Sequence, residues 1–157
     1  MSVSIKLEGV GNVERIFREL ADEIGDKKAN SKILVPAVRE AMKPVLAQAR
    51  ANAPEDTGGL KRSLQVEARR PTRKDKRSKY ISSTDTVISL VTTAPGKKLA
   101  KMGINSAARA IAQEFGTARH PAQPYLRTAL ESQSQSVIQN LSQILARRID
   151  KYKKANL

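Results

Sequence analysis

Hydrophobic and polar positions alternate along the first residues of the chain and then change to a helical period. Val3, Ile5 and Leu7 fall on one side of an extended segment, which is the period of a half-buried strand. Farther along, apolar residues recur at gaps of three and four, as on one face of a helix, up to Gly25. This face consists of Val13, Ile16, Phe17, Leu20 and Ile24. The pattern predicts a strand followed by a helix.

A second helical pattern extends from about residue 31 to residue 52. Pro36 fits its first turn, but Pro44 would remove a hydrogen bond from the helix interior and clash with the preceding turn. We therefore expect a kink or a break there. The helix should end at Ala53-Pro54, because the residue before a proline is pushed out of the α region.

Two strand patterns follow, at residues 63–68 and 80–93, the second rich in β-branched residues. Residues 69–79 between them hold seven basic side chains against one acid, Asp75, which predicts a mobile, solvated arm on a long hairpin. The basic residues are Arg69, Arg70, Arg73, Lys74, Lys76, Arg77 and Lys79. The arm is either a flexible solvated loop or an electrostatic contact to DNA phosphates or to an acidic protein face.

The last third of the chain predicts two helices. Residues 107–115 place Ala107, Ala108, Ile111, Ala112 and Phe115 on one apolar side, and Gly116 ends the helix. A long C-terminal helix spans residues 124–153, with Pro124 in its first turn. The predicted fold is α+β: a small antiparallel sheet with a long hairpin arm, packed against N-terminal helices and the long C-terminal helix. A chain of 157 residues suffices for one domain with a real core, so residues 1–157 are predicted to form a single domain.

Charge and composition narrow the classes of function. With 29 Lys and Arg against 15 Asp and Glu, the net charge of +14 attracts phosphate polymers or acidic protein surfaces. The absence of cysteine excludes disulfides, thiolate metal sites and a cysteine nucleophile. The N-terminal residues do not resemble a signal peptide, and no window approaches the roughly 20 apolar residues of a membrane span. We expect a cytosolic product without membrane contact.

The segment from Glu114 to Leu130 contains the only histidine and a carboxylate, so it is a candidate active site. His120 lacks the further ligands that a metal site needs and the partners that a hydrolytic base needs. Glu114 has no second titratable group nearby in the sequence and is interpreted as a surface or capping residue. We therefore expect no enzyme, no catalytic or metal-binding residue and no cofactor.

Two motifs in a fixed order carry a resemblance to a known family. In the first, a helix ends in Ala-Pro before Thr-Gly and Leu; its positions are Ala53, Pro54, Thr57, Gly58, Leu60 and Ser63. In the second, Glu-Phe-Gly-Thr precedes Pro-aromatic-Leu-Arg; its positions are Glu114, Phe115, Gly116, Thr117, Pro124, Tyr125, Leu126, Arg127 and Ala129. This order resembles the HK97 gp10-like family of tailed-phage neck and tail-completion proteins. Thr128 stands where many members have proline, Gly59 is an extra glycine, and the basic arm is unusually dense.

The resemblance implies a structural virion protein, made in the cytoplasm of the bacterial host. Its copies would form a ring, a hexamer or a dodecamer, in the neck between a head-completion or stopper protein and the tail terminator or tail tube. The assembly residues would be Thr57, Gly58, Leu60, Glu114, Phe115, Gly116, Thr117, Pro124, Tyr125, Leu126 and Arg127. Residues 114–127 would form a rigid connector, with Phe115 and Tyr125 as buried anchors and Glu114 paired with Arg127 within or between subunits. The arm would contact a neighbouring subunit, an adjacent ring or DNA in the lumen. The alternative is a stand-alone basic nucleic-acid-binding protein, which the net charge favours.

Overall fold

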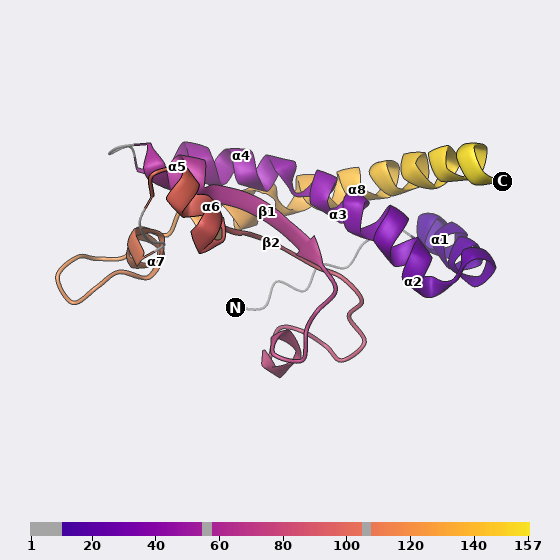
Figure 1. The fold of residues 1–157 in the computed structure, drawn as a ribbon, viewed down its shortest axis with the longest axis horizontal. Coiled ribbons are helices and arrows are strands. Elements are labelled where there is room, and N and C mark those ends of the chain that lie inside the picture. Colours follow the sequence, from indigo (N-terminus) through magenta and orange to yellow (C-terminus); the bar gives the residue numbers. More distant parts are fainter. Residues whose placement is uncertain (1–10, 55–57, 105–107) are drawn as a thin grey trace. The chain divides into compact units, whose positions relative to one another are not determined.

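The computed structural model describes residues 11–54, 58–104 and 108–157 (Figure 1). The strand expected around Val3, Ile5 and Leu7 lies outside these residues. The chain forms two compact units, each built from segments that are distant in the sequence. Unit 1 holds the described residues up to Ala41 together with residues 68–89 and 138–157, and unit 2 holds residues 42–67 and 90–137. The expected single domain stays a prediction.

The N-terminal helices of unit 1 follow from the apolar period and from the prolines. Helix α1 spans Gly11–Ile24 and ends at Gly25, whose φ of 93° is left-handed, as predicted. Then come α2 (Asp26–Ala29), the π-helical stretch η1 (Asn30–Leu34) and α3 (Val35–Ala41). Pro36 cannot donate a backbone hydrogen bond, and the widened turns of η1 lie just before it.

The predicted break at Pro44 is confirmed. Helix α3 ends at Ala41, and α4 (Lys43–Asn52) starts with Pro44 in its first turn, where the backbone N–H that proline lacks would have no partner within the helix. At the other end of α4, Ala53 is extended, with φ −66° and ψ 135°, so the predicted stop before Pro54 is confirmed as well.

The sheet consists of two antiparallel strands, β1 (Leu64–Arg69) and β2 (Ile88–Thr93). The short helix α5 (Gly59–Ser63) precedes β1, and α6 (Gly96–Lys101) follows β2. The prediction that the second strand starts near residue 80 is wrong. The N–H groups of Ser82 and Thr84 donate to Asp85 Oδ2 (2.8 Å) and to Ser82 Oγ (3.3 Å), so polar side chains close a turn in place of the ladder.

Helix α7 spans Ala108–Phe115, and α8 spans Leu126–Asn156. The long helix thus begins two residues later than predicted and ends three residues later. Its first part, to residue 137, belongs to unit 2 and the remainder to unit 1. The predicted architecture of N-terminal helices, a small antiparallel sheet and a long C-terminal helix is confirmed (Figure 1).

Each unit has its own hydrophobic core. In unit 1, α1, η1, α3 and α8 contribute Leu20, Ile33, Ala37, Leu145 and Ile149. In unit 2, helices α4 and α8 and strand β1 supply most of the core, which is Met42, Val45, Ala49, Ala53, Leu64, Tyr125 and Ala129. The alanines in both cores have no side chain beyond Cβ, which lets neighbouring backbones approach closely.

Polar contacts reinforce unit 1 around Glu40 on α3. Its carboxylate accepts hydrogen bonds from the guanidinium groups of Arg147 and Arg148 on α8, with Arg148 Nη2 at 2.7 Å and Nε at 3.0 Å. Hydrogen bonds from Arg147 and then Arg148 hold the pKa of Glu40 below its ordinary value. The carboxylate therefore stays charged and joins α3 to α8.

Candidate assembly site

Glu114, near the end of α7, caps the first turn of α8. One carboxylate oxygen, Oε2, accepts the backbone N–H groups of Tyr125 (2.9 Å) and Leu126 (2.8 Å), and Oε1 accepts that of Arg127 (3.1 Å). These N–H groups have no partner within the helix, and a negative charge there is favoured by the helix dipole. The side chain is buried. The interpretation of Glu114 as a capping residue is confirmed.

The chain between Glu114 and Tyr125 is held by a second set of contacts. Gln113 O accepts the N–H of Gln123 (2.9 Å), and the two glutamine side chains bond at 2.8 Å. At the far end of the loop the N–H of Thr117 donates to His120 O (2.8 Å), and the N–H of His120 donates to Thr117 Oγ1 (3.1 Å). The lone histidine thus lies in a turn. The connector is therefore a loop whose two ends are joined by the hydrogen bonds between Gln113 and Gln123.

The structure corrects one expectation about the connector and part of another. Phe115 is not a buried anchor, because 77% of it is exposed. Within the chain, Glu114 contacts Arg127 through the Arg127 backbone N–H and not through its guanidinium group. A pair of Glu114 and Arg127 between subunits stays a prediction. Both observations have one cause. The cap turns Glu114 inward, so that the buried face of α7 carries Ala110 and Glu114, and Ile111 and Phe115 point to solvent.

Tyr125 is the anchor that the sequence did predict correctly. It is only 2% exposed and lies in the core of unit 2, and Leu126 packs against that core. Burial, and to a smaller extent the charge of Glu114, raises the pKa of Tyr125 to about 12. Within the part of the chain that the structure describes, its hydroxyl has no hydrogen-bond partner. The aromatic ring of Tyr125 therefore stabilises the unit by packing.

Pro124 directly precedes Tyr125, and its carbonyl oxygen accepts a hydrogen bond from the hydroxyl of Thr128 (2.7 Å).

The first motif is placed in the same unit. Thr57 lies outside the described residues. Gly58 adopts the left-handed conformation, φ 72°, at the start of α5, and its carbonyl accepts the N–H of Arg62 (3.1 Å). Leu60 packs against the core that contains Tyr125, and its carbonyl accepts Ser63 Oγ (2.6 Å). Leu60 and the connector thus share one core.

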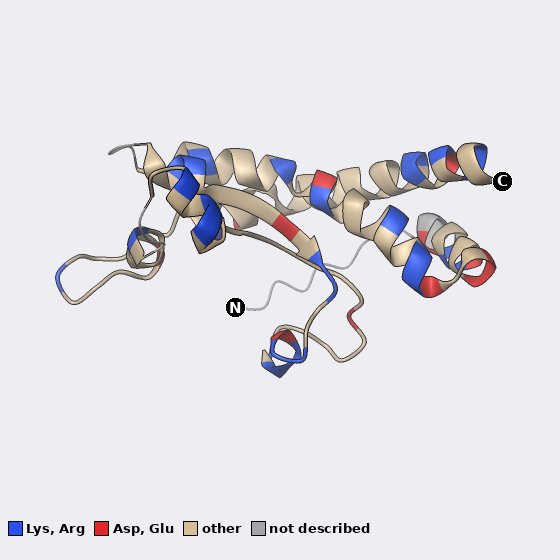
Figure 2. Ribbon diagram, in the orientation of Figure 1, with Lys and Arg blue, Asp and Glu red and all other residues tan. Residues whose placement is uncertain are grey.

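The basic arm, residues 69–79, belongs to unit 1 and forms the first part of the connection from β1 to β2, beginning with the last residue of β1 (Figure 2). It contains the 3-10 helix η2 (Asp75–Arg77), and the turn that leads into this helix is closed by reciprocal hydrogen bonds at the spacing of a capping box: the N–H of Thr72 donates to Asp75 Oδ2 (2.7 Å), and the N–H of Asp75 donates to Thr72 Oγ1 (3.3 Å). Arg69 donates to both carboxylate oxygens of Asp75. The arm therefore has a local fold. Its mobility stays a prediction.

The sequence matches a family model over residues 17–155, and the family is described as "Bacteriophage HK97-gp10, putative tail-component". The chain belongs to this HK97-gp10-like family. The match covers nearly all of both units. No curated protein and no solved structure matches the chain. The resemblance inferred from the two motifs is confirmed, and this HK97-gp10-like protein is a member of a family of phage tail components.

Three contacts of the HK97-gp10-like protein were not predicted: the Gln113 to Gln123 bridge, the Thr72 to Asp75 cap and the ion pair of Asp75 with Arg69. The Thr72-x-x-Asp75 spacing could have predicted the first of the arm contacts, because it is the spacing of a capping box. No signal pointed to the bridge, because two glutamines ten residues apart meet only when the chain doubles back. Among the described residues, no group of three or more His, Cys, Asp or Glu could hold a metal ion, and no helix is long and apolar enough to cross a membrane.

The turn in the basic arm should be sensitive to acid. Hydrogen bonding by Arg69, and then by Thr72, holds the pKa of Asp75 well below its ordinary value. A lowered pKa means that the turn is stabilised above the ordinary pKa of an aspartate and loses this stabilisation as the pH falls through the lowered value. In hydrogen exchange at neutral pH, Asp75→Asn should increase exchange at residues 72–78. Asp85→Asn, outside η2, is the control. Unchanged exchange in Asp75→Asn would contradict the role of the carboxylate.

Proposed function

We propose that this protein is a structural subunit of the virion that forms a ring in the neck of a tailed phage. The ring joins head-completion or stopper proteins to the tail terminator or tail tube. It is made in the bacterial cytoplasm and becomes part of the particle. The protein acts by assembly and catalyses no reaction.

Family membership over residues 17–155 is the observation that carries the proposal. The site supports it in physical terms. The connector is capped by Glu114, closed by the glutamine bridge and anchored by Tyr125, which suits a surface that must keep its shape during assembly. The basic arm adds a charged surface that can contact a neighbouring subunit, an adjacent ring or DNA in the lumen.

Deletion of the gene from its parent phage tests the proposal. Electron microscopy of the lysate should show filled heads and separate tails, and added purified protein should restore joined particles. A quadruple variant of the arm, in which Arg70, Arg73, Lys74 and Arg77 become glutamine, should restore fewer joined particles than the wild-type protein. Intact infectious virions in the deletion lysate would rule out a role in the neck.

A stand-alone nucleic-acid-binding protein is the second candidate, because of the net charge of +14 and the density of the basic arm. Filter binding at rising salt separates the two. A neck subunit should bind DNA weakly, without sequence preference and with a steep loss as salt rises. Tight binding that discriminates between sequences at physiological salt would favour the second candidate.

A further inference from the structure

Helix α7 presents an apolar stripe to solvent. Ile111 is 61% and Phe115 77% exposed, one helical turn apart. Glu114, on the neighbouring face of the helix, fixes the orientation of α7, because its carboxylate is held by three backbone N–H groups at the start of α8. A fixed, exposed phenylalanine beside an isoleucine is the kind of anchor that protein interfaces use.

The chain around α7 restricts what can cover this stripe. Residues 90–130 carry six Lys and Arg side chains, all exposed, and one carboxylate, that of Glu114, which is buried. The exposed charges of the segment are therefore entirely positive. A partner must offer carboxylates together with apolar contact. A second α7 in a symmetric contact does not, because it would bring cations against cations.

Helix α1 has the complementary character. It carries four carboxylates (Glu14, Glu19, Asp22 and Glu23) against two guanidinium groups, in a chain whose net charge is +14. Figure 2 shows acidic positions on this helix. Leu20 of α1 lies in the core of unit 1, and Ile16, Phe17 and Ile24 pack against it, so the charged side is the one available to a partner.

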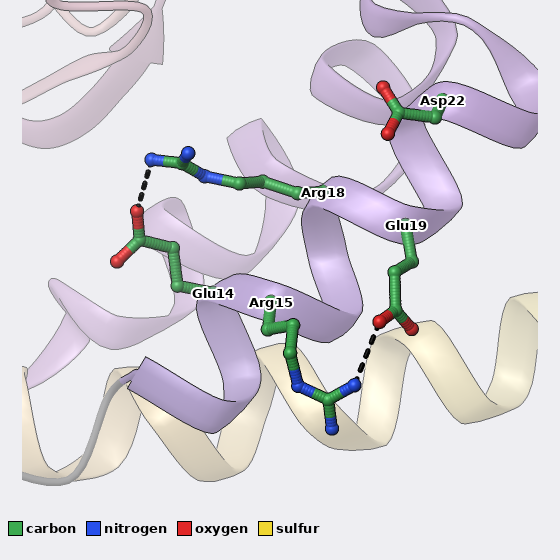
Figure 3. A pocket seen from close by; sticks show the side chains of 5 residues that line it. All are labelled: Glu14, Arg15, Arg18, Glu19 and Asp22. Atoms are coloured by element: carbon green, nitrogen blue, oxygen red, sulfur yellow. Dashed lines mark hydrogen bonds and ion pairs between the residues drawn. The ribbon is translucent and has the colours of Figure 1, made fainter.

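The surface of α1 is also hollowed. Glu14, Arg15, Arg18, Glu19 and Asp22 line a shallow depression of about 370 Å³ (Figure 3). Arg15 pairs with Glu19 (2.7 Å) and Arg18 pairs with Glu14 (2.5 Å), each one helical turn away. Each pair lays its arginine along the helix, so that the methylene stems of both arginines are part of the lining. The depression therefore combines hydrocarbon walls with carboxylates.

We propose that α7 of one copy docks on α1 of a second copy, with Phe115 and Ile111 in the depression and the carboxylates facing the cations of residues 90–130. The inference rests on the proposed ring, because it names the two surfaces through which copies meet. Two different surfaces are joined, so each copy can bind one neighbour through α7 and another through α1, as a ring requires.

Sedimentation velocity of the purified full-length protein tests the pairing. Near 0.15 M salt the long-range repulsion between copies is screened over about 8 Å, whereas direct contacts remain. The wild-type protein should self-associate with rising concentration. Phe115→Ser should weaken association about 30-fold or more, as loss of an interface anchor does. The double variant Glu19→Lys, Asp22→Lys should weaken it as well. Leu130→Ser, which alters an exposed leucine on α8, should leave it unchanged.

Mixing the two defective variants is the decisive step. The Phe115→Ser copy keeps its acidic α1, and the charge-reversed copy keeps its Phe115, so the mixture should form one-to-one dimers that neither variant forms alone. A mixture that stays monomeric would overturn the pairing of α7 with α1. Wild-type protein that stays monomeric as its concentration is raised, or a Leu130→Ser variant that loses as much association as Phe115→Ser, would also overturn it. These outcomes are independent of the gene deletion, which tests the role in the neck without reference to α7.

Discussion

Replacing Glu114 by alanine should lower the melting temperature of the protein by roughly 6–20 °C. The change leaves three backbone N–H groups at the start of α8 without their acceptor and removes a charge that interacts favourably with the helix dipole. The loss of three hydrogen bonds to a charged group, together with the loss of the favourable interaction with the helix dipole, should lower the free energy of unfolding by about 3–5 kcal/mol. Thermal denaturation followed by circular dichroism at 222 nm measures the shift.

Two further variants separate the cap from a general loss of charge. Glu114→Gln keeps one carbonyl oxygen as an acceptor, so its melting temperature should lie between those of the wild type and Glu114→Ala. Glu131→Ala removes an exposed carboxylate from α8 and should change stability by less than about 0.5 kcal/mol. If Glu114→Ala and Glu131→Ala melted alike, the cap would not stabilise the connector.

Gly116→Ala should destabilise the protein by about 2–4 kcal/mol, because it combines backbone strain with a steric clash. Gly116 has φ 76°, which side chains other than hydrogen disfavour. A Cβ at this position would lie 2.7 Å from the Ala122 backbone N and 3.1 Å from His120 O. Both neighbours are backbone atoms of the connector, so the loop itself would have to move. Urea denaturation gives the change in unfolding free energy.

Gly103 provides a matched control for Gly116. Its φ of 74° is nearly the same, but a Cβ there would meet nothing within 4 Å. Gly103→Ala should therefore lower the free energy of unfolding only by the strain of a positive φ at a residue with a Cβ, about 1–2 kcal/mol. The difference in unfolding free energy between the two variants measures the steric clash inside the connector. If both variants lost the same stability, the close approach of the Ala122 backbone to Gly116 would not contribute.

Helix α7 shows where reasoning from pattern alone reaches its limit. The sequence predicted its end at Phe115, because Gly116 and the apolar spacing are local signals. The predicted first residue, Ala107, lies outside the described residues. The sequence misjudged which side is buried. The apolar stripe of Ile111 and Phe115 suggested the core face, but the side that the fold buries is the one that brings Glu114 to α8. A charged cap outweighs the burial of two apolar side chains when several N–H groups would otherwise be unsatisfied.

The basic arm shows the same limit for charged residues. Its composition correctly indicated that residues 69–79 would not contribute to a core, since none of the described hydrophobic core residues comes from them. Composition could not indicate that the single acid would organise the turn. Asp75 does so because Arg69 and Thr72 lie within reach only once the chain bends.

By itself, the sequence determined the helix boundaries at Gly25, Pro44, Ala53 and Gly116, the existence of two strands and the family. These features depend on backbone restrictions and on periodicity, which act over a few residues. The tertiary structure alone decided which face of α7 is exposed, what Glu114 caps and how the connector closes. Those outcomes depend on which N–H and C=O groups of distant residues meet, and a buried polar group takes whichever partner satisfies it.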